Sequence, residues 1–269
     1  MDTEKGFSDM RSLEEFMSLF PAYDLKSAKD VRFALAHSID QTNLNPSLGE
    51  ESFFKWIDKN KDQGFASLCL PQFVAPHAVS ELQGSPTKVC TTLGFPHGNQ
   101  SIRSLIAQAQ EMIEHGVGEL DMLMNYGQFK EGKHAYVFES VTRVYQASLE
   151  AWKEKYGEVR SEDEEEEKLV FKVILETSEL SDEQICEASD LVSSIGVDFV
   201  KTSSGFSKGG ANLHDVQLMF STVEPGCHIK ASGGIRTLEE AYDFLEAGAS
   251  RLGTSKGLEI LEQFDKTFG

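Results

Sequence analysis

The sequence lacks the features that mark several classes of protein. Its 269 residues contain no apolar run near the roughly 20 residues that a membrane span needs. Residues 1–6 lack the basic and apolar regions of a signal peptide. Basic residues are scarce, 25 against 44 acidic, and the formal charge of −19 argues against nucleic-acid and anionic-membrane partners. We therefore expect a cytoplasmic protein that binds neither.

Metal-binding patterns are also missing. The histidines form no HxH or HExxH pair. The four cysteines show no metal-type spacing and are typical of reduced thiols in a reducing compartment: Cys69, Cys90, Cys186 and Cys227. We predict no metal and no cofactor, with a zinc-dependent enzyme as the rival interpretation.

Strand-like and helix-like segments alternate along most of the chain. Strands are expected at 33–39, 64–70, 88–95, 117–124, 169–175 and 250–254, and two further strands carry Lys201 and Lys230. Amphipathic helices are expected at 52–62, 73–82, 102–113, 133–156, 213–222 and 257–264, and after capping boxes at 181–184 and 237–240.

Eight strand–helix units with apolar strands favour a parallel sheet that closes on itself. The chain is long enough for one such domain, with 40% hydrophobic residues. An open doubly wound sheet is the alternative, but residues 40–46, after the first strand, are not the glycine-rich fingerprint that it would need. We predict an α/β protein with a single (β/α)8 TIM barrel.

Two segments lie outside this repeat. Residues 13–20 form an amphipathic stretch ended by Pro21, so we predict an N-terminal helical extension at 1–30 and the barrel at 31–269. Residues 161–167 are almost wholly acidic and connect a helix to a strand, on the barrel face away from the chemistry. We interpret them as a solvated loop, with a docking tail for a basic partner as the alternative.

The most informative residues are two lysines at successive strand ends. Lys201 ends the strand 198–201, and Lys230 occupies a similar place in the next strand. Burial lowers the pKa of a lysine, and a second cation nearby lowers it further. A neutral amine can attack a carbonyl and form a Schiff base. The alternative is that Lys201 reaches solvent or pairs with Asp198.

Acidic residues accompany these lysines in the predicted strands. Asp121 lies near the end of an apolar strand, where a carboxylate needs a cationic partner or a proton-transfer role. Glu119, two residues earlier, is better explained by a structural salt bridge, and Lys172 by pairing with an inward carboxylate. Asp40 and Glu176 lie nearer the site face, and Glu176 could pair with one of the two lysines.

Two glycine-containing segments, 232–236 and 253–257, follow the last two strands. Glycines let backbone N–H groups approach an anion, and the following helix N-terminus adds a favourable dipole. The loops after strands seven and eight are also the usual phosphate position in this fold. We predict a phosphate site there, with ordinary strand-to-helix turns as the alternative.

Residues 198–205 and 230–237 together resemble deoxyribose-phosphate aldolase, a class I Schiff-base aldolase family. Four further motifs match in the family's order, so that the resemblance runs from about residue 38 to 258: 40–44, 94–98, 119–122 and 171–177. The chain departs from many members at Gln41, where they have histidine or leucine, and at Asn45, where they have lysine. The N-terminal extension and the acidic run also exceed the family core.

The resemblance implies reversible cleavage of 2-deoxy-D-ribose 5-phosphate to acetaldehyde and D-glyceraldehyde 3-phosphate. It places the Schiff base on Lys201 and the proton relay on Asp121 and Lys230. It also implies substrate or phosphate contacts at eight positions: Asp40, Ser203, Gly205, Gly233, Gly234, Arg236, Gly253 and Ser255. A homodimer or higher homo-oligomer is compatible with it.

Two other functions stay open at this point. One is an aldolase-like binding or scaffold protein with little turnover, which would use the acidic run and the N-terminal helix as partner surfaces. The other is a Schiff-base aldolase that acts on a different phosphosugar.

Overall fold

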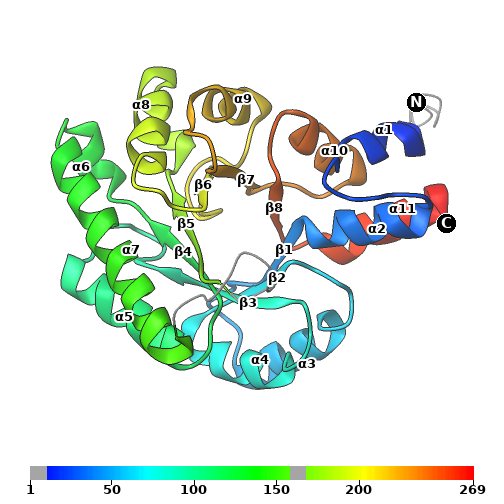
Figure 1. Cartoon of the computed structure of the whole chain (residues 1–269), viewed down its shortest axis with the longest axis horizontal. Coiled ribbons are helices and arrows are strands. Elements are labelled where there is room, and N and C mark those ends of the chain that lie inside the picture. The colour runs from blue at the N-terminus through cyan, green and yellow to red at the C-terminus, as the bar shows by residue number, and fades with distance from the viewer. Residues whose placement is uncertain (1–10, 158–167) are drawn as a thin grey trace.

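Eight parallel strands form a closed barrel in this computed structural model, which describes residues 11–157 and 168–269. The strands pair in chain order and β8 pairs with β1 (Figure 1). They are β1 Ile39–Thr42, β2 Ser67–Leu70, β3 Lys88–Leu93, β4 Glu119–Leu123, β5 Val170–Ile174, β6 Phe199–Lys201, β7 His228–Ser232 and β8 Arg251–Thr254. The predicted (β/α)8 barrel is confirmed, whereas the acidic run at 161–167 lies outside the described residues.

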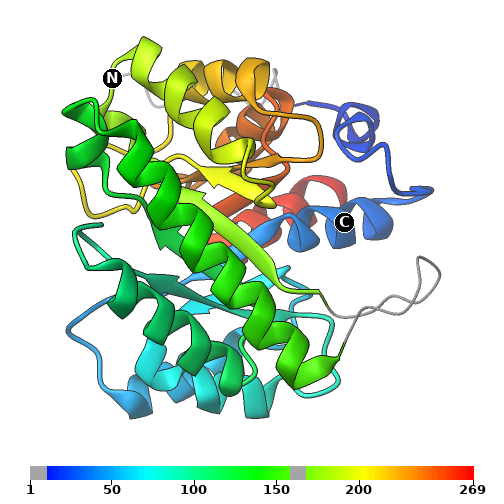
Figure 2. The same ribbon diagram turned by 60° about the vertical axis from the view of Figure 1, so that its left-hand side comes forward.

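Helices surround the barrel on its outer side, and the long α7 runs across one flank (Figure 2). The α-helices are α1 Leu13–Ser18, α2 Ala28–His37, α3 Glu50–Asn60, α4 Ala75–Glu81, α5 Ile102–Glu114, α6 Tyr126–Lys130, α7 His134–Tyr156, α8 Asp182–Ser193, α9 Leu213–Thr222, α10 Leu238–Glu246 and α11 Gly257–Phe268. Two short 3₁₀ turns are η1 Gln72–Val74 and η2 Thr177–Glu179. No helix in the described ranges has an apolar stretch long enough to cross a bilayer.

The first strand was predicted at the wrong place. Residues 33–37 belong to α2, which begins after the N-cap Ser27, and the strand begins at Ile39. Val31, Ala34 and Leu35 are buried at spacings of three and four residues, which is the pattern of one helix face. Only the short apolar cluster 33–36 suggested a strand, and such a run does not separate helix from strand.

Local signals in the sequence placed the later helices well. The capping boxes form as predicted. The hydroxyls of Ser181 and Thr237 accept the backbone N–H of Gln184 and Glu240, and the backbone N–H of each cap residue donates back to the Gln184 or Glu240 side chain. The short α6 was not predicted. It begins shortly after β4, behind the N-cap Asn125, whose side chain accepts the N–H of Gln128.

The N-terminal helix α1 packs against the last two helices of the barrel. Phe16 is buried and makes edge-to-face contacts with Tyr242 of α10 and Phe264 of α11, with ring centroids 5.0 and 5.7 Å apart. Figure 1 shows α1 beside α10, near the C-terminus. Because α2 begins at Ala28, the predicted boundary at residue 30 falls inside a helix, and the division into extension and barrel stays a prediction.

Truncation of Phe16 tests whether α1 belongs to the cooperative fold. We expect Phe16→Ala to lower the free energy of unfolding by about 3 kcal/mol, because a buried aromatic ring loses its contacts and leaves a void. Phe33→Ala, at a side chain that is 50% exposed, is the matched control and should change little. Urea denaturation followed by circular dichroism measures both. Equal effects of the two substitutions would contradict a stabilising role for α1.

Candidate active site

The centre of the barrel holds one carboxylate that contacts three lysines. Asp121 Oδ2 lies 2.7 Å from Nζ of Lys201 and 2.7 Å from Nζ of Lys230, and Oδ1 lies 3.0 Å from Nζ of Lys172. All four side chains are buried. Strand register explains the meeting, since Lys201 pairs with Lys230 across β6 and β7, and Asp121 pairs with Lys172 across β4 and β5.

A second group of charges supports the first. Asp40 in β1 lies 2.5 Å from Lys230 Nζ and 2.7 Å from Nη1 of Arg251 in β8. Glu119 lies 2.5 Å from Lys172 and 3.3 Å from Arg251. The structural salt bridges predicted for Glu119 and Lys172 are therefore confirmed. The sequence argument missed Arg251, although an arginine two residues before Gly253 in an apolar strand points to the same face.

The charges shift one another strongly. Burial alone would raise the pKa of Asp121, but Lys172, Lys201 and Lys230 outweigh it and hold this pKa well below its usual range. Asp40 behaves in the same way, because Lys230, Arg251 and Lys172 overcome the effect of burial on its pKa. Burial lowers the pKa of Lys230, yet Asp121 and Asp40 reverse this and raise it above its usual value. Lys230 is thus held as a cation.

Two weaker expectations turn out differently. Lys201 does not use Asp198 as its partner; Asp198 instead pairs with Lys168 at 2.9 Å and accepts the backbone N–H of Phe171. Glu176 also has another role than pairing with a lysine. Its buried carboxylate accepts the backbone N–H of Ser204 at 3.2 Å, in the loop that follows Lys201.

The loops after β6 and β7 lie against each other beside the lysines. Ala211 N–H donates to the Gly233 carbonyl at 2.9 Å, and a Cβ on Gly210 would lie 2.3 Å from the same oxygen. Gly233 and Gly234 have φ of 98° and 89°, which glycine adopts readily. The buried Ser203 hydroxyl has no hydrogen-bond partner among the described residues and lies next to Gly233. These residues offer polar groups to an anion.

The remaining predicted contacts lie in two different places. Gly205, with φ of 82°, Arg236 and Ser255 are exposed in the loops after β6, β7 and β8. Gly253 lies inside the barrel instead, where a Cβ would come within 3.0 Å of Lys230 Cε and 2.6 Å of Ser232 Oγ. The missing side chain of Gly253 therefore makes room for Lys230.

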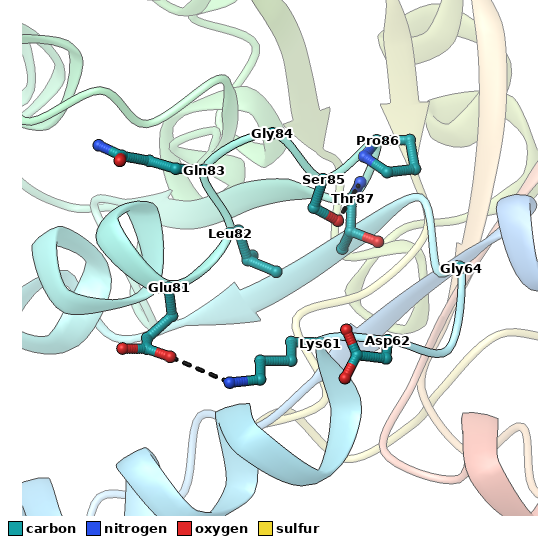
Figure 3. Close-up of a pocket in the computed structure, with 10 residues that line it drawn as sticks. All are labelled: Lys61, Asp62, Gly64, Glu81, Leu82, Gln83, Gly84, Ser85, Pro86 and Thr87. Atoms are coloured by element: carbon teal, nitrogen blue, oxygen red, sulfur yellow. Dashed lines mark hydrogen bonds and ion pairs between the residues drawn. The ribbon is translucent and has the colours of Figure 1, made fainter.

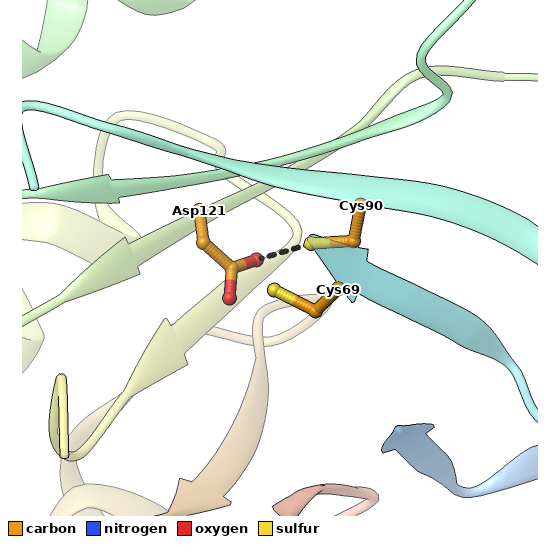
Figure 4. Close-up of side chains that lie close together, drawn as sticks. All are labelled: Cys69, Cys90 and Asp121. Atoms are coloured by element: carbon orange, nitrogen blue, oxygen red, sulfur yellow. Dashed lines mark hydrogen bonds between the residues drawn. The ribbon is translucent and has the colours of Figure 1, made fainter. Parts of the chain in front are cut away.

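Two buried thiols approach the central carboxylate from β2 and β3. Cys69, Cys90 and Asp121 place one ligand atom each within 4.8 Å of one another (Figure 4). Both oxygens of Asp121 already contact lysine ammonium groups, so a divalent cation here would face repulsion from Lys172 and Lys230. The trio does not fit a metal. Burial raises the pKa of Cys90 well above its usual value, and its thiol donates to Asp121 Oδ1 at 3.3 Å.

Two surface cavities of similar size lie at opposite ends of the barrel. One, of about 430 Å³, is formed by the segments that precede β2 and β3 and contains the Lys61–Glu81 ion pair (Figure 3). The other, of about 440 Å³, is formed by segments that follow β3, β4, β5 and β6. Only this second cavity is at the end where Lys201 lies. Its lining is Pro96, His97, Tyr126, Glu176, Glu179, Phe206, Ser207 and Lys208.

Comparison with known proteins agrees with this geometry. Residues 34–263 match the family described as DeoC/LacD family aldolase. The chain belongs to the DeoC/LacD aldolase family. It is 38% identical over 232 residues to a deoxyribose-phosphate aldolase of Thermoanaerobacter pseudethanolicus, covering 86% of this chain and 97% of that protein. It is 41% identical over 224 residues to that of Streptococcus mutans, covering 83% and 94%.

Solved structures lead to the same family. A structure described as the unique tetrameric structure of deoxyribose phosphate aldolase from Aeropyrum pernix has a TM-score of 0.76 and 27% identity, covering 96% of this chain and all of that one. A structure titled "QR15, an Aldolase" has a TM-score of 0.76 and 33% identity, covering 86% and 96%. The family and the barrel fold are thus shown.

The departure at Gln41 leaves the lysine network untouched. Gln41 is buried on the outer side of β1, where its amide donates to Asn60 of α3 at 2.9 Å and its oxygen accepts the N–H of Gly257 of α11 at 3.0 Å. It joins two helices to the strand next to Asp40. In this member of the aldolase family, the residue after the first-strand aspartate therefore supports the barrel wall.

The depressed pKa of Asp40 predicts a specific loss of stability in acid. A carboxyl whose folded pKa lies below its unfolded value of about 3.9 stabilises the fold above that pH, and the contribution is lost as the pH falls below about 4. Asp40→Asn removes this contribution and leaves Lys230 and Arg251 short of a countercharge. We expect a loss of about 3 kcal/mol at pH 7 and a shallower fall in stability between pH 5 and pH 3.

Urea denaturation at several pH values measures both effects. Asp24→Asn is the control, since the Asp24 side chain is 82% exposed. A stability profile of Asp40→Asn that runs parallel to the wild type down to pH 3 would contradict the assignment of Asp40 to the acid-sensitive network.

Proposed function

We propose that the protein is a class I aldolase that cleaves 2-deoxy-D-ribose 5-phosphate reversibly to acetaldehyde and D-glyceraldehyde 3-phosphate. The observation that carries the proposal is the shared carboxylate of Asp121 between Lys201 and Lys230. Relatives with 38–41% identity that are named deoxyribose-phosphate aldolase support the choice of substrate. Deoxyribonucleotide and carbohydrate catabolism is the setting that this substrate implies.

Charge counting supports Lys201 as the nucleophile. The described network contains four basic side chains and three carboxylates: Lys172, Lys201, Lys230 and Arg251 against Asp40, Glu119 and Asp121. A buried excess charge is unfavourable, so one neutral amine balances the group. Lys201 contacts one carboxylate, which it shares, whereas Lys172, Lys230 and Arg251 each contact at least two. Lys201 is thus the basic group with the fewest carboxylate contacts in the network.

The chemistry follows from these positions. Neutral Lys201 Nζ adds to C1 of the open-chain sugar, and loss of water from the carbinolamine gives an iminium. The C2–C3 bond then breaks as the C3 hydroxyl loses its proton, and the bonding electrons move into the iminium to form an enamine. D-glyceraldehyde 3-phosphate leaves. Protonation of the enamine at C2 and hydrolysis release acetaldehyde and restore the amine.

Asp121 is placed to carry the protons in these steps. One of its oxygens contacts both Lys201 and Lys230, so a proton taken from one group can be passed to the other or to a water that enters with substrate. In the free protein Lys230 is charged and stabilises the carboxylate form of Asp121. The iminium itself accepts the electrons of the broken bond. The proposed mechanism therefore needs no metal ion for this role.

We place the phosphate in the loops after β6, β7 and β8. The partnerless Ser203 hydroxyl and the left-handed Gly205, Gly233 and Gly234 support this position. The helix α11 begins at Gly257, directly after this loop, and its N-terminus adds a dipole that favours an anion beside Ser255. Arg236 supplies an exposed cation at the rim, and Asp40 acts on substrate through Lys230.

A homo-oligomer and a cytoplasmic location complete the proposal. The relative from Aeropyrum pernix is described as tetrameric, which supports assembly of this chain into a homo-oligomer. The four cysteines are free, in keeping with a reducing compartment.

Borohydride trapping with 2-deoxy-D-ribose 5-phosphate tests the nucleophile. We expect a reduced adduct on Lys201, found by peptide mass spectrometry, and no adduct in Lys201→Ala, whose turnover should fall by at least about 10⁴-fold because the covalent route is lost. The exposed Lys26→Ala is the control. An adduct on Lys230 would reverse the two lysine roles, and folded protein without any adduct would favour a binding or scaffold protein.

Removal of one hydroxyl tests the phosphate position. Ser203→Ala breaks no hydrogen bond in the free protein, so its stability should match the wild type. We expect KM for 2-deoxy-D-ribose 5-phosphate to rise about tenfold, because a charge-assisted hydrogen bond is lost. KM for unphosphorylated 2-deoxy-D-ribose should not change. A parallel rise for both sugars would place Ser203 away from the phosphate.

A further inference from the structure

Glu176 is a conformational exception directly after β5. With φ of 61° and ψ of 59°, it is the one non-glycine residue with positive φ in the described chain. This left-handed region is disfavoured for a residue with a long side chain. Glu176 is also buried, with 1% of its surface exposed. A strained and buried acid near a reactive lysine calls for a local reason.

The hydrogen bonds around Glu176 show that it is the extra residue of a bulge. In a regular parallel pair, two N–H groups two residues apart donate to carbonyls two residues apart. Here Leu175 N–H donates to the Lys201 carbonyl and Thr177 N–H to the Thr202 carbonyl, both at 2.9 Å. An advance of two residues, from Leu175 to Thr177, is therefore paired with an advance of only one residue, from Lys201 to Thr202. Bulges of this kind redirect side chains next to functional sites.

The bulge turns the Glu176 carboxylate to the loop that follows Lys201. Glu176 Oε1 accepts the N–H of Ser204, and Ser204 Oγ in turn accepts the N–H of Phe206. At the start of the loop, two hydrogen bonds fix Thr202 to β7. Its N–H donates to the Lys230 carbonyl, and its hydroxyl donates to the Ser232 carbonyl. Ser203 lies between these two fixed residues, and its hydroxyl has no partner in the described part of the chain.

We propose that Glu176 is a positioning residue that sets substrate preference: by holding Ser204 N–H, it fixes the loop so that Ser203 and Gly205 face the phosphate of the sugar. The inference rests on the proposed function and deepens it. Glu176 acts through the backbone and does not touch the reacting carbon. Its loss therefore weakens binding of phosphorylated sugar and leaves the Schiff-base chemistry of Lys201 in place.

Three substitutions separate the hydrogen bond, the charge and the strain. Glu176→Gln keeps an oxygen acceptor for Ser204 N–H and removes the charge. Glu176→Ala removes the acceptor and keeps an unfavourable φ. Glu176→Gly also removes the acceptor, but glycine adopts this φ without strain. We therefore expect this variant to fold even if Glu176→Ala does not. Glu183→Ala, at an exposed position in the first turn of α8, is the matched control.

Steady-state kinetics of the full-length protein on 2-deoxy-D-ribose 5-phosphate and 2-deoxy-D-ribose give the test. Glu176→Gly and Glu176→Ala should raise KM for the phosphorylated sugar about tenfold or more, with kcat, borohydride trapping and KM for the unphosphorylated sugar within about threefold of wild type. Glu176→Gln should restore KM to within about threefold.

Three results would overturn the inference. Wild-type KM in Glu176→Gly would show that the hydrogen bond does not position the loop. An equal loss on both sugars, with slower trapping, would mean that Glu176 acts on the chemistry or on the fold as a whole. In both cases the wild type still cleaves the phosphosugar, so the proposed function stands. A wild type that cleaves neither sugar overturns both.

Discussion

The carboxylate of Asp121 is the group on which the rest of the site depends. It is buried in the barrel, where an isolated negative charge would be strongly unfavourable, and three lysines make its ionised form stable. The dependence is mutual, because Lys172 and Lys230 are buried and need acidic partners to stay charged. Asp40 and Glu119 help to hold Lys172 and Lys230 as cations, and Arg251 completes the network by pairing with both carboxylates. Lys201 is the member with the least compensation, so the arrangement that stabilises the core also defines the reactive amine.

Closure of the barrel brings these charges together. Asp121 and Lys201 are 80 residues apart in the chain, Asp121 and Lys230 are 109 apart, and Asp40 and Arg251 are 211 apart. The pairing of β8 with β1 closes the ring and places Arg251 next to Asp40. Inward side chains then come from six of the eight strands, and glycine at position 253 leaves the space that Lys230 needs. The fold therefore contributes position, and the side chains contribute the balance of charge.

The sequence predicted most of this and missed parts for identifiable reasons. Strand ends rich in polar groups pointed to Asp121, Lys201 and Lys230, since the closed topology places such ends on one face. The first strand was misplaced because four consecutive apolar residues in α2 show neither a helical nor a strand periodicity. Arg251 and the Cys69–Cys90 pair were missed because their role depends on partners in other strands, which no local pattern reveals. The hydrogen bond of Glu176 was also out of reach, because a bulge depends on how two strands pair and changes the direction of one side chain.

The whole chain is strongly negative whereas the buried charges of the site balance one another, and this limits how an anionic substrate is recognised. The formal charge of −19 repels a phosphosugar at long range, but at physiological salt exposed charges are screened beyond about 8 Å. Inside the barrel, four basic groups face three carboxylates, and the adjoining loops present Ser203 and the N–H groups near Gly233. Attraction thus operates at short range, where it also fixes orientation. Long-range electrostatic attraction therefore does little to speed the encounter with substrate. Recognition depends instead on the shape of the loop after β6, so the contact between Glu176 and Ser204 bears directly on which sugars bind.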